Sequence, residues 1–319
     1  MAKPARAKAK KAASAAAAEP TLSARVTRTH GRHHFVTDDE GRTFEAHRRG
    51  KKADVVVGDL VHCTEPQGNV VAIESIEPRR NLLYRSDEWR IKELAANLDL
   101  VAVVFAPRPA FNPWFVWKAV VAARTEGIAL LLIRNKTDLL EDRDKMQDFC
   151  RLMHEECGED IVEVSATTEI NAAVKTFSGY FAGKTVLLVG QSGMGKSTIL
   201  NALCPEAAAR TQEYSQALNL GKQTTTTTTL YSVVLDGLES AIIDSPGFQE
   251  FGLAHVDAPE LIAAMPDLAR RVSGCRFYNC THTNEPGCSV RAALEEGQIS
   301  KERYAFYCAL MQEIKNRRP

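Results

Sequence analysis

The eight residues at 190–197, Gly-Gln-Ser-Gly-Met-Gly-Lys-Ser, limit the possible folds more than any other part of the chain. They follow an apolar run at 185–189 and lead into a helix-like run at 198–203, which gives the order strand, glycine-rich loop, helix. The glycines let successive backbone N–H groups turn toward a phosphate chain, and the start of the helix adds partial positive charge. A glycine-rich turn with a chance Lys-Ser is the competing interpretation. Because every fixed position of the motif is filled after a strand, we expect a phosphate-binding loop.

The polar side chains of this loop suit the phosphates and the Mg²⁺ of a bound nucleotide. Lys196 can reach the β and γ phosphates as a mobile cation, and the Ser197 hydroxyl can bind the Mg²⁺ that bridges them. Lys196 is therefore also a candidate catalytic residue. The residues expected to contact the nucleotide here are Gly190, Gln191, Ser192, Gly193, Met194, Gly195, Lys196, Ser197 and Thr198.

A second polar loop, Asn-Lys-Thr-Asp at 135–138, follows the apolar run at 129–133 and indicates which base is bound. The Asp138 carboxylate can accept both hydrogens on the Watson–Crick edge of guanine. Adenine would present a lone pair to it and leave a desolvated charge unpaired, which disfavours an ATPase or a kinase. Lys136 would pack along the base plane, and Asn135 would tie the loop to the phosphate site. Taken alone, four polar residues after a strand are also typical of an ordinary turn.

A third loop, Asp-Ser-Pro-Gly at 244–247, directly follows the apolar run at 241–243. Asp244 suits a Walker-B role in which it holds Mg²⁺ through water, and the Gly247 N–H suits the γ-phosphate. All three loops lie at the carboxyl ends of predicted strands, where ligands bind in open α/β sheets.

These residues resemble the Ras-like GTPases, and Ser165-Ala166 matches the short loop that backs the guanine in that family. The order of the loops is rotated, because both guanine loops here precede the phosphate loop. This is the order expected from a circular permutation. The strands that can still build the same sheet are predicted at 98–105, 129–134, 160–164, 185–189, 229–235 and 239–243.

Beyond these loops, Cys275, Cys280, His282 and Cys288 follow the spacing C-x4-C-x-H-x5-C. Three thiolates and one imidazole complete a closed tetrahedral Zn²⁺ site. The other cysteines have no pairing pattern, and no secretory signal precedes them, so we expect a reducing cytoplasm rather than a disulfide framework.

The permutation, the flanking segments and the cysteine motif together resemble the bacterial ribosome small subunit-dependent GTPase A family, from about residue 22 to the C-terminus. The resemblance implies an N-terminal OB-fold that binds RNA, a C-terminal zinc domain, and the reaction of GTP with water to give GDP and phosphate. It also implies that the partner is the small ribosomal subunit and its ribosomal RNA, during late assembly. A nucleotide-gated RNA adaptor with negligible turnover is the alternative.

The group that orients the attacking water departs from both families. A Ras-type enzyme has a Gln just after its Asp-x-x-Gly, but Phe248 stands there, and Phe cannot hydrogen-bond water. The resembling family shows a histidine before its threonine run, and Gln223 occupies that position here. Gln223 is therefore the predicted catalytic residue, with Gln249 as its competitor.

The six threonines at 224–229 suit a switch loop that orders only with GTP, in which one hydroxyl binds Mg²⁺. Thr225 is the predicted ligand. The later threonines also suit the start of a β-branched strand that runs toward Leu235.

The N-terminal part combines a basic tail with a predicted small barrel. Residues 1–20 carry five Lys/Arg and one acid, so the remainder has a formal charge of −4 in a chain of net charge zero. The tail is a solvated, disordered segment or an arm that touches RNA phosphates. Residues 22–77 contain about five short strands with turns at 39–41 and 66–69, which suits a barrel. Basic residues at 42, 47–49 and 51–52 lie near Phe44 in the sequence. Basic residues with an aromatic one suit a nucleic-acid groove, and they equally suit the solvent-exposed face of any barrel.

The predicted fold class is α/β, a circularly permuted P-loop GTPase domain with an N-terminal OB-type β-barrel and a C-terminal zinc-binding helical domain. The predicted parts are a disordered basic tail at 1–21, an OB-fold at 22–80, a linker at 81–97, the GTPase domain at 98–250 and the zinc-binding domain at 251–319. We expect helices that begin at Asn112-Pro113 and at Ser300. No apolar run is long enough to span a membrane, and we expect a cytoplasmic monomer.

Overall fold

The computed structural model describes residues 22–30, 33–48, 55–86, 91–140, 143–205, 207, 227–246 and 248–316. The predictions for the tail at 1–21, and for Gln223, Thr225 and Gly247, lie outside these residues. Among the described helices, none is both long and apolar enough to cross a membrane.

The centre of the molecule is a six-stranded α/β sheet in the order β10-β9-β8-β11-β13-β12. The pairs along it are parallel except β12 with β13, which is antiparallel. The bounds are β8 (Leu100–Phe105), β9 (Ala129–Arg134), β10 (Asp160–Glu163), β11 (Thr185–Gly190), β12 (Thr228–Leu235) and β13 (Leu238–Asp244). All six predicted strands are confirmed within one or two residues at either end.

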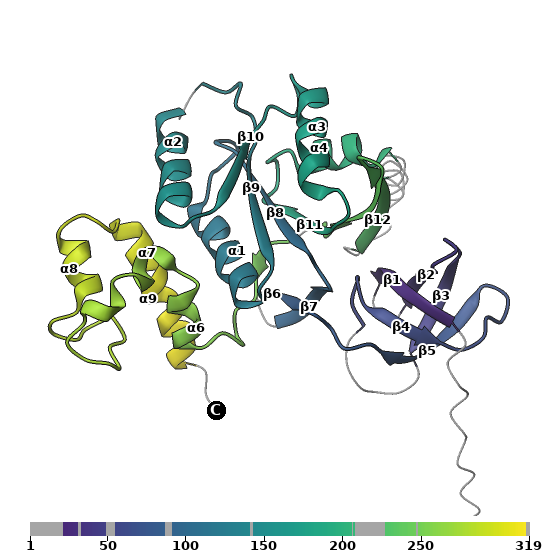
Figure 1. Ribbon diagram of the computed structural model, residues 1–319, viewed down its shortest axis with the longest axis horizontal. Coiled ribbons are helices and arrows are strands. Elements are labelled where there is room, and N and C mark those ends of the chain that lie inside the picture. The colour runs from purple at the N-terminus through teal and green to yellow at the C-terminus, as the bar shows by residue number, and fades with distance from the viewer. Residues whose placement is uncertain are drawn as a thin grey trace, which may run out of the picture.

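Helices cover both faces of this sheet (Figure 1). They are α1 (Pro113–Thr125), α2 (Arg143–Arg151) with the π-helical turn η1 (Leu152–Glu156), α3 (Ile170–Phe181) and α4 (Lys196–Leu203). Strand β8 shows why both faces need cover, because every one of its side chains is buried. Val101 and Val103 belong to the core under α1 and α2, and Ala102 and Val104 to the core under α3 and α4. This alternation is the pattern of a strand buried on both sides.

Five strands at the N-terminal end close into a barrel in the order β1-β2-β3-β5-β4, with β4 returning to β1. They are β1 (Leu22–His30), β2 (His33–Asp38), β3 (Thr43–Arg48), β4 (Leu60–Cys63) and β5 (Val70–Ile76). The predicted five-stranded barrel is therefore confirmed. Phe44, however, does not lie at a nucleic-acid groove. Side chains alternate along β3, so Phe44 and Ala46 point into the barrel core while Glu45 and His47 point outward.

The barrel and the central sheet are joined edge to edge. Strand β12 pairs antiparallel with β1 through Thr229 with Arg28 and Thr228 with Thr29. One hydrogen-bonded sheet therefore runs from β10 to the barrel, which lies beyond β12 in Figure 1. A side-chain hydrogen bond also links the barrel to the central sheet, because Arg25 Nη2 of β1 donates to Thr185 Oγ1 of β11 at 2.7 Å.

The segment predicted as a linker contains a hairpin of its own. Strands β6 (Leu82–Ser86) and β7 (Ile91–Ala96) pair antiparallel, and β14 (Glu250–Phe251) adds a third strand to β6. The chain that leaves the third predicted loop is thus fixed beside the chain that enters the central sheet.

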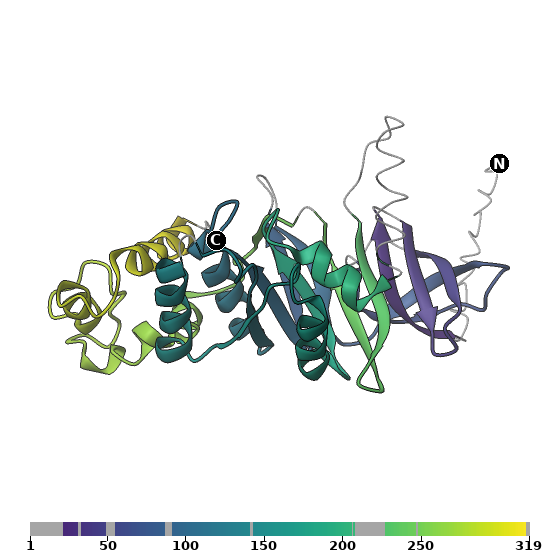
Figure 2. The same ribbon diagram turned by 90° about the horizontal axis from the view of Figure 1, so that it is seen from above.

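The C-terminal part is helical, with α6 (Ala258–Ala263), α7 (Pro266–Ala269), the 3-10 turn η2 (Val272–Gly274), α8 (Ser289–Glu295) and α9 (Lys301–Asn316). It lies at the opposite end of the molecule from the barrel in both views (Figures 1 and 2). Its core is continuous with the α1 side of the sheet, because the Phe306 ring lies 5.4 Å from the rings of Trp114 and of Trp117.

Both predicted helix starts are confirmed. Asn112 Oδ1 accepts from the Trp114 N–H at 3.0 Å ahead of α1, and Pro113 occupies the first turn. Ser300 Oγ accepts from the Arg303 N–H at 3.1 Å ahead of α9.

Candidate nucleotide and metal sites

The predicted phosphate loop connects β11 to the N-terminus of α4, at the carboxyl edge of the sheet. Two of its glycines are required by close approach. A Cβ on Gly190 would lie 2.5 Å from the Val104 carbonyl oxygen, and one on Gly195, where φ is +96°, would collide with the Asn135 amide. Ser197 and Thr198 are exposed in the first turn of α4, whereas Met194 is buried beneath the loop. The loop therefore presents backbone and hydroxyl groups to solvent at a helix N-terminus, the arrangement that binds anions.

Lys196 and Asp244 form an ion pair across this edge. Lys196 Nζ lies 2.5 Å from Asp244 Oδ1, and both side chains are largely buried. The carboxylate at the end of β13 is thus within reach of the lysine and of the first turn of α4. A Mg²⁺ ion fits this donor set, because the Ser197 hydroxyl and the Asp244 carboxylate are hard oxygen ligands of the kind it prefers.

The guanine loop is hydrogen-bonded directly to the phosphate loop. Asn135 Nδ2 donates to the Met194 carbonyl oxygen at 2.8 Å, and Lys136 Nζ donates to the Gly193 carbonyl oxygen at 2.6 Å. Asn135 Oδ1 accepts from the Ala166 N–H at 3.0 Å, which ties the loop after β10 to the same point. One side chain, Asn135, therefore holds three loops together.

Asp138 is exposed, as a base-binding group must be, but it is oriented by its neighbours. Ser165 Oγ donates to Asp138 Oδ1 at 2.5 Å, and Thr168 Oγ1 donates to Ser165 Oγ at 2.7 Å. The structure thus brings Ser165 and Ala166 to the guanine loop, one through its side chain and the other through its backbone.

The region after Asp244 packs against the sheet and against α1. Phe248 is buried, and its ring lies 6.0 Å from Phe115 and 4.7 Å from Phe251. Ser245 Oγ lies 3.1 Å from Thr228 Oγ1, so the end of the threonine run contacts the start of the third loop. Phe248 thus fills core space, and neither its chemistry nor its position suits the orientation of water.

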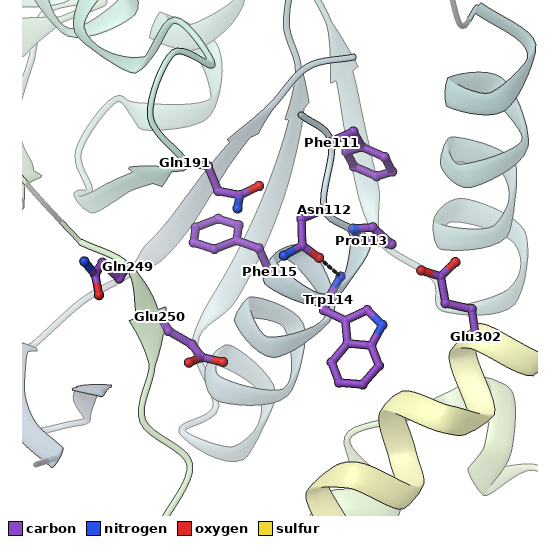
Figure 3. A pocket seen from close by; sticks show the side chains of 9 residues that line it. All are labelled: Phe111, Asn112, Pro113, Trp114, Phe115, Gln191, Gln249, Glu250 and Glu302. Atoms are coloured by element: carbon purple, nitrogen blue, oxygen red, sulfur yellow. Dashed lines mark hydrogen bonds between the residues drawn. The ribbon is translucent and has the colours of Figure 1, made fainter. Parts of the chain in front are cut away.

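Gln249, the competing candidate for that task, lines a pocket of about 480 Å³ that also includes Gln191 of the phosphate loop. Figure 3 shows Gln191 beside the ring of Phe115, with Gln249 and Glu250 on the neighbouring chain segment and Glu302 reaching in from α9. Gln249 is exposed here, and the structure therefore places this amide near the phosphate loop without fixing it there.

The four predicted zinc ligands come together in the C-terminal part, with ligand atoms that all lie within 4.8 Å of one another. His282 Nδ1 is 3.4 Å from Cys275 Sγ and 3.5 Å from Cys288 Sγ, and the two sulfurs are 3.9 Å apart. Helix α9 fixes this loop, because Tyr304 Oη donates to the His282 carbonyl oxygen at 2.8 Å and Tyr307 Oη to that of Thr281 at 2.9 Å.

The electrostatics of this cluster fit a bound cation. Burial lowers the pKa of His282, which favours the neutral imidazole that a metal requires. Burial, with the neighbouring Cys288 and Cys275, raises the pKa of Cys280 to about 12, because thiolates crowd one another. A Zn²⁺ ion would offset that repulsion and hold the sulfurs deprotonated, so three cysteines and one histidine suit a closed structural site.

Several contacts of the site had no signal in the sequence. Lys118 of α1 forms an ion pair with Glu250 on β14, just beyond the third loop. His30 Nδ1 of the barrel lies 3.0 Å from Thr227 Oγ1, within the threonine run. Both pairs join residues more than a hundred positions apart. The sequence shows that each residue is charged or polar, but it does not show which residue is its partner.

Comparison with known proteins agrees with this geometry. A family model described as RsgA GTPase matches residues 76–254. A protein of Bordetella pertussis named "Small ribosomal subunit biogenesis GTPase RsgA" is 43% identical over 300 residues, which cover 92% of this chain and 97% of the relative. The protein of the same name from Variovorax paradoxus is 42% identical over 328 aligned residues and covers 100% of both chains.

Two solved structures share the fold. YjeQ from Thermotoga maritima matches with a TM-score of 0.67 at 27% identity, covering 93% of this chain and 99% of its own. YloQ, described as a circularly permuted GTPase, matches with a TM-score of 0.64 at 25% identity, covering 93% and 96%. With the permuted order of the sheet, the barrel and the cysteine–histidine cluster all present, this chain belongs to the RsgA GTPase family.

Proposed function

We propose that this chain hydrolyses GTP to GDP and phosphate during biogenesis of the small ribosomal subunit, the process that the names of its relatives state for those proteins. The observation that carries the proposal is the hydrogen bond from Asn135 to the Met194 carbonyl oxygen. It joins the guanine loop to the phosphate loop, so that a base at Asp138 and phosphates at Lys196 belong to one ligand.

The residues divide the work of binding. Asp138, oriented by Ser165, accepts from the guanine, and the backbone of the phosphate loop with Lys196 holds the phosphates. Ser197 and Thr225 would bind Mg²⁺ directly and Asp244 through water, with the Gly247 N–H at the γ-phosphate. When bound, Mg²⁺ supplies charge neutralisation at the phosphates.

The attacking water needs an orienting group, and we infer that Gln223 supplies it. Phe248 occupies the Ras-type position and is 7% exposed within an aromatic cluster, so it cannot act on water. An amide at position 223 can both donate to and accept from a water molecule. Because no orienting group follows Asp-x-x-Gly directly, basal turnover should be slow until a partner orders the threonine loop.

The partner we propose is the small ribosomal subunit with its ribosomal RNA. The barrel at one end of this chain and the zinc-binding part at the other end would both contact it. The chain would act as a cytoplasmic monomer, and Zn²⁺ held by Cys275, Cys280, His282 and Cys288 would be structural. The boundaries at residues 21, 80, 97 and 250 remain part of this proposal. The same burial of Phe248 also favours a second candidate, an RNA adaptor that uses GTP only to fix its shape.

GTP turnover with and without purified small subunits tests the proposal. We expect strong stimulation of the wild type. In Gln223→Ala the stimulation should fall roughly ten- to a thousandfold with GTP affinity nearly unchanged, the size expected for one transition-state group. Gln147→Ala, on the exposed side of α2, is the matched amide control.

The outcomes separate the candidates. If Gln223→Ala is stimulated as well as the wild type but Gln249→Ala is not, Gln249 orients the water. If both variants respond like the wild type, a group of the subunit does so. If the wild type shows neither turnover nor stimulation, the adaptor is the correct function.

A further inference from the structure

The loop between the first two cysteines of the cluster, Arg276-Phe277-Tyr278-Asn279, exposes aromatic rings to solvent. All four residues are exposed. Tyr278 is 102% exposed, which makes it the most exposed large apolar side chain among the described residues; Leu140 follows at 70%. The neighbour of Tyr278, Phe277, is 39% exposed. Elsewhere in the described chain, aromatic rings are mostly buried in the cores. Phe277 and Tyr278 are neighbours, so together they form an exposed apolar patch on one loop.

The loop is held rigidly although its side chains are free of the core. The Arg276 N–H donates to the Gly287 carbonyl oxygen at 3.0 Å, and the Cys280 N–H donates to that of Phe277 at 3.2 Å. Both flanking cysteines belong to the cluster that fits Zn²⁺. The hydroxyl of Tyr307 on α9 then fixes the chain at Thr281, immediately after the loop. The backbone that carries Tyr278 is therefore held on both sides, which lowers the entropy lost on binding.

The loop carries one cation of its own, Arg276. Between residues 270 and 291 there are four arginines and one acid, Glu285, although Arg270 is paired with the Glu156 carboxylate. The Glu285 carboxylate is turned into its own loop, where it accepts from the Thr281 N–H at 2.9 Å and the Thr283 N–H at 3.1 Å. The Arg276 guanidinium lies 5.5 Å from the centre of the Phe277 ring and so stands beside the exposed aromatics. A ligand bound at this loop would therefore contact the aromatic rings and the Arg276 guanidinium at the same time.

We propose that this loop binds an unpaired RNA base by stacking it on Tyr278, with Arg276 on an adjacent phosphate. Unpaired bases splay out to stack on aromatic side chains, and every base offers a π face, so the contact tolerates different sequences. Asn279 adds an amide that can hydrogen-bond a base edge. This inference rests on the proposed function, because it assigns part of the contact with ribosomal RNA to one loop.

The test uses the full zinc-containing chain, a fluorescent 12-nucleotide oligoadenosine and a 12-base-pair RNA duplex, with affinity measured by anisotropy. Loss of one base stack costs about a factor of ten to a hundred in affinity, so Tyr278→Ala should weaken single-strand binding by that amount and leave duplex binding unchanged. Tyr278→Phe and Tyr278→Trp should stay within about threefold of the wild type. Tyr180→Ala, an exposed tyrosine on α3, is the matched control.

Tyr278→Leu separates stacking from apolar contact, because it keeps an apolar side chain without a ring. It should lose affinity as Tyr278→Ala does, and zinc content confirms that each variant keeps its fold. The proposal is overturned if Tyr278→Leu binds the single strand like the wild type, if Tyr278→Ala loses no affinity for it, or if Tyr278→Ala weakens duplex binding by the same factor. Wild-type GTP turnover is measured in parallel, so failure of the proposed function appears there and not in RNA binding.

Discussion

The carboxylate proposed to bind the base shows how much a single residue depends on its neighbours. Asp138 is exposed, yet Ser165 donates to one of its oxygens at 2.5 Å and is itself held by Thr168 at 2.7 Å. A short chain of hydroxyl groups therefore sets the direction of the carboxylate before any base arrives. This preorganisation lets one side chain discriminate between bases, because a wrong partner leaves its desolvated oxygens unpaired.

Replacement of Asp138 by Asn should weaken guanine binding by about 2 to 4 kcal/mol, because an amide donor then faces a guanine donor. Binding of GTP, ATP and xanthosine triphosphate by the variant is the measurement. Xanthosine triphosphate should recover part of the loss, since its base carries an acceptor where guanine has an amine. Asp148→Asn, on the exposed side of α2, is the control. An unchanged preference for GTP over ATP in Asp138→Asn would refute the guanine assignment.

A second residue, Arg303, ties α9 to the rest of the C-terminal core. It is 1% exposed, its Nε donates to Asp267 Oδ2 at 2.8 Å, and its guanidinium lies 5.0 Å from the Trp117 ring of α1. Such a buried pair contributes little net stability, but removal of one partner leaves an uncompensated charge.

Arg303→Met should therefore lower the free energy of unfolding by about 3 to 5 kcal/mol, because the Asp267 carboxylate stays buried without its partner. Denaturant unfolding of the single variant and of the double variant Arg303→Met/Asp267→Asn measures it. The double variant should recover a large part of the loss. Equal losses in both would show that the packing of Arg303 against Trp117, and not the ion pair, is the stabilising contact.

At the scale of elements, local patterns predicted the parts whose signals lie within a few residues. The six strands, the cap at Asn112 and the loop at 190–197 have such signals, and the structure has these elements at those positions. The same reasoning did not predict that Phe44 is buried, because its ring packs into the barrel core although the Arg42 guanidinium lies 5.9 Å from the ring centre. The pairing of β1 with β12 had no local signal at all, since register between strands two hundred residues apart depends on the assembled fold.

The cysteine–histidine cluster brings both ends of the loop at 275–288 together. Cys280→Ser should lose Zn²⁺ and unfold the loop at 275–288, because a bound metal would hold both ends of that loop through its four ligands. GTP affinity should survive, since the loops proposed to bind nucleotide lie at the edge of the central sheet. Metal analysis, hydrogen exchange and GTP titration measure the three effects, with Cys308→Ser on α9 as a cysteine that is not a ligand. Native protein without zinc would contradict the metal assignment.

At the scale of the whole molecule, the threonine run is connected to both flanking parts. On one side Thr228 and Thr229 pair with β1 of the barrel, and His30 reaches Thr227 at 3.0 Å. On the other side Thr228 contacts Ser245, and Lys118 holds Glu250 where the chain turns toward the C-terminal helices. A partner that binds the barrel therefore acts on a strand that continues directly into the threonine loop.

This connection predicts that the barrel controls stimulation more than basal turnover. His30→Ala removes a side chain that contacts Thr227 but leaves the phosphate and guanine loops intact. We expect basal GTP turnover and GTP affinity to stay within about twofold of the wild type. Stimulation by small subunits should fall severalfold, because a conformational change in the barrel is then coupled less tightly to the threonine run.

The matched control is His62→Ala, a barrel histidine on β4 whose side-chain partners are Glu77 and Ser23, at the other end of β1 from its pairing with β12. Turnover is measured at saturating subunit concentration, so that weaker binding of the subunit cannot imitate weaker transmission. If His30→Ala and His62→Ala are stimulated equally, the edge between β1 and β12 carries no signal. The barrel would then serve only to dock the partner, and control of the threonine loop would have to pass through Glu250 and α1.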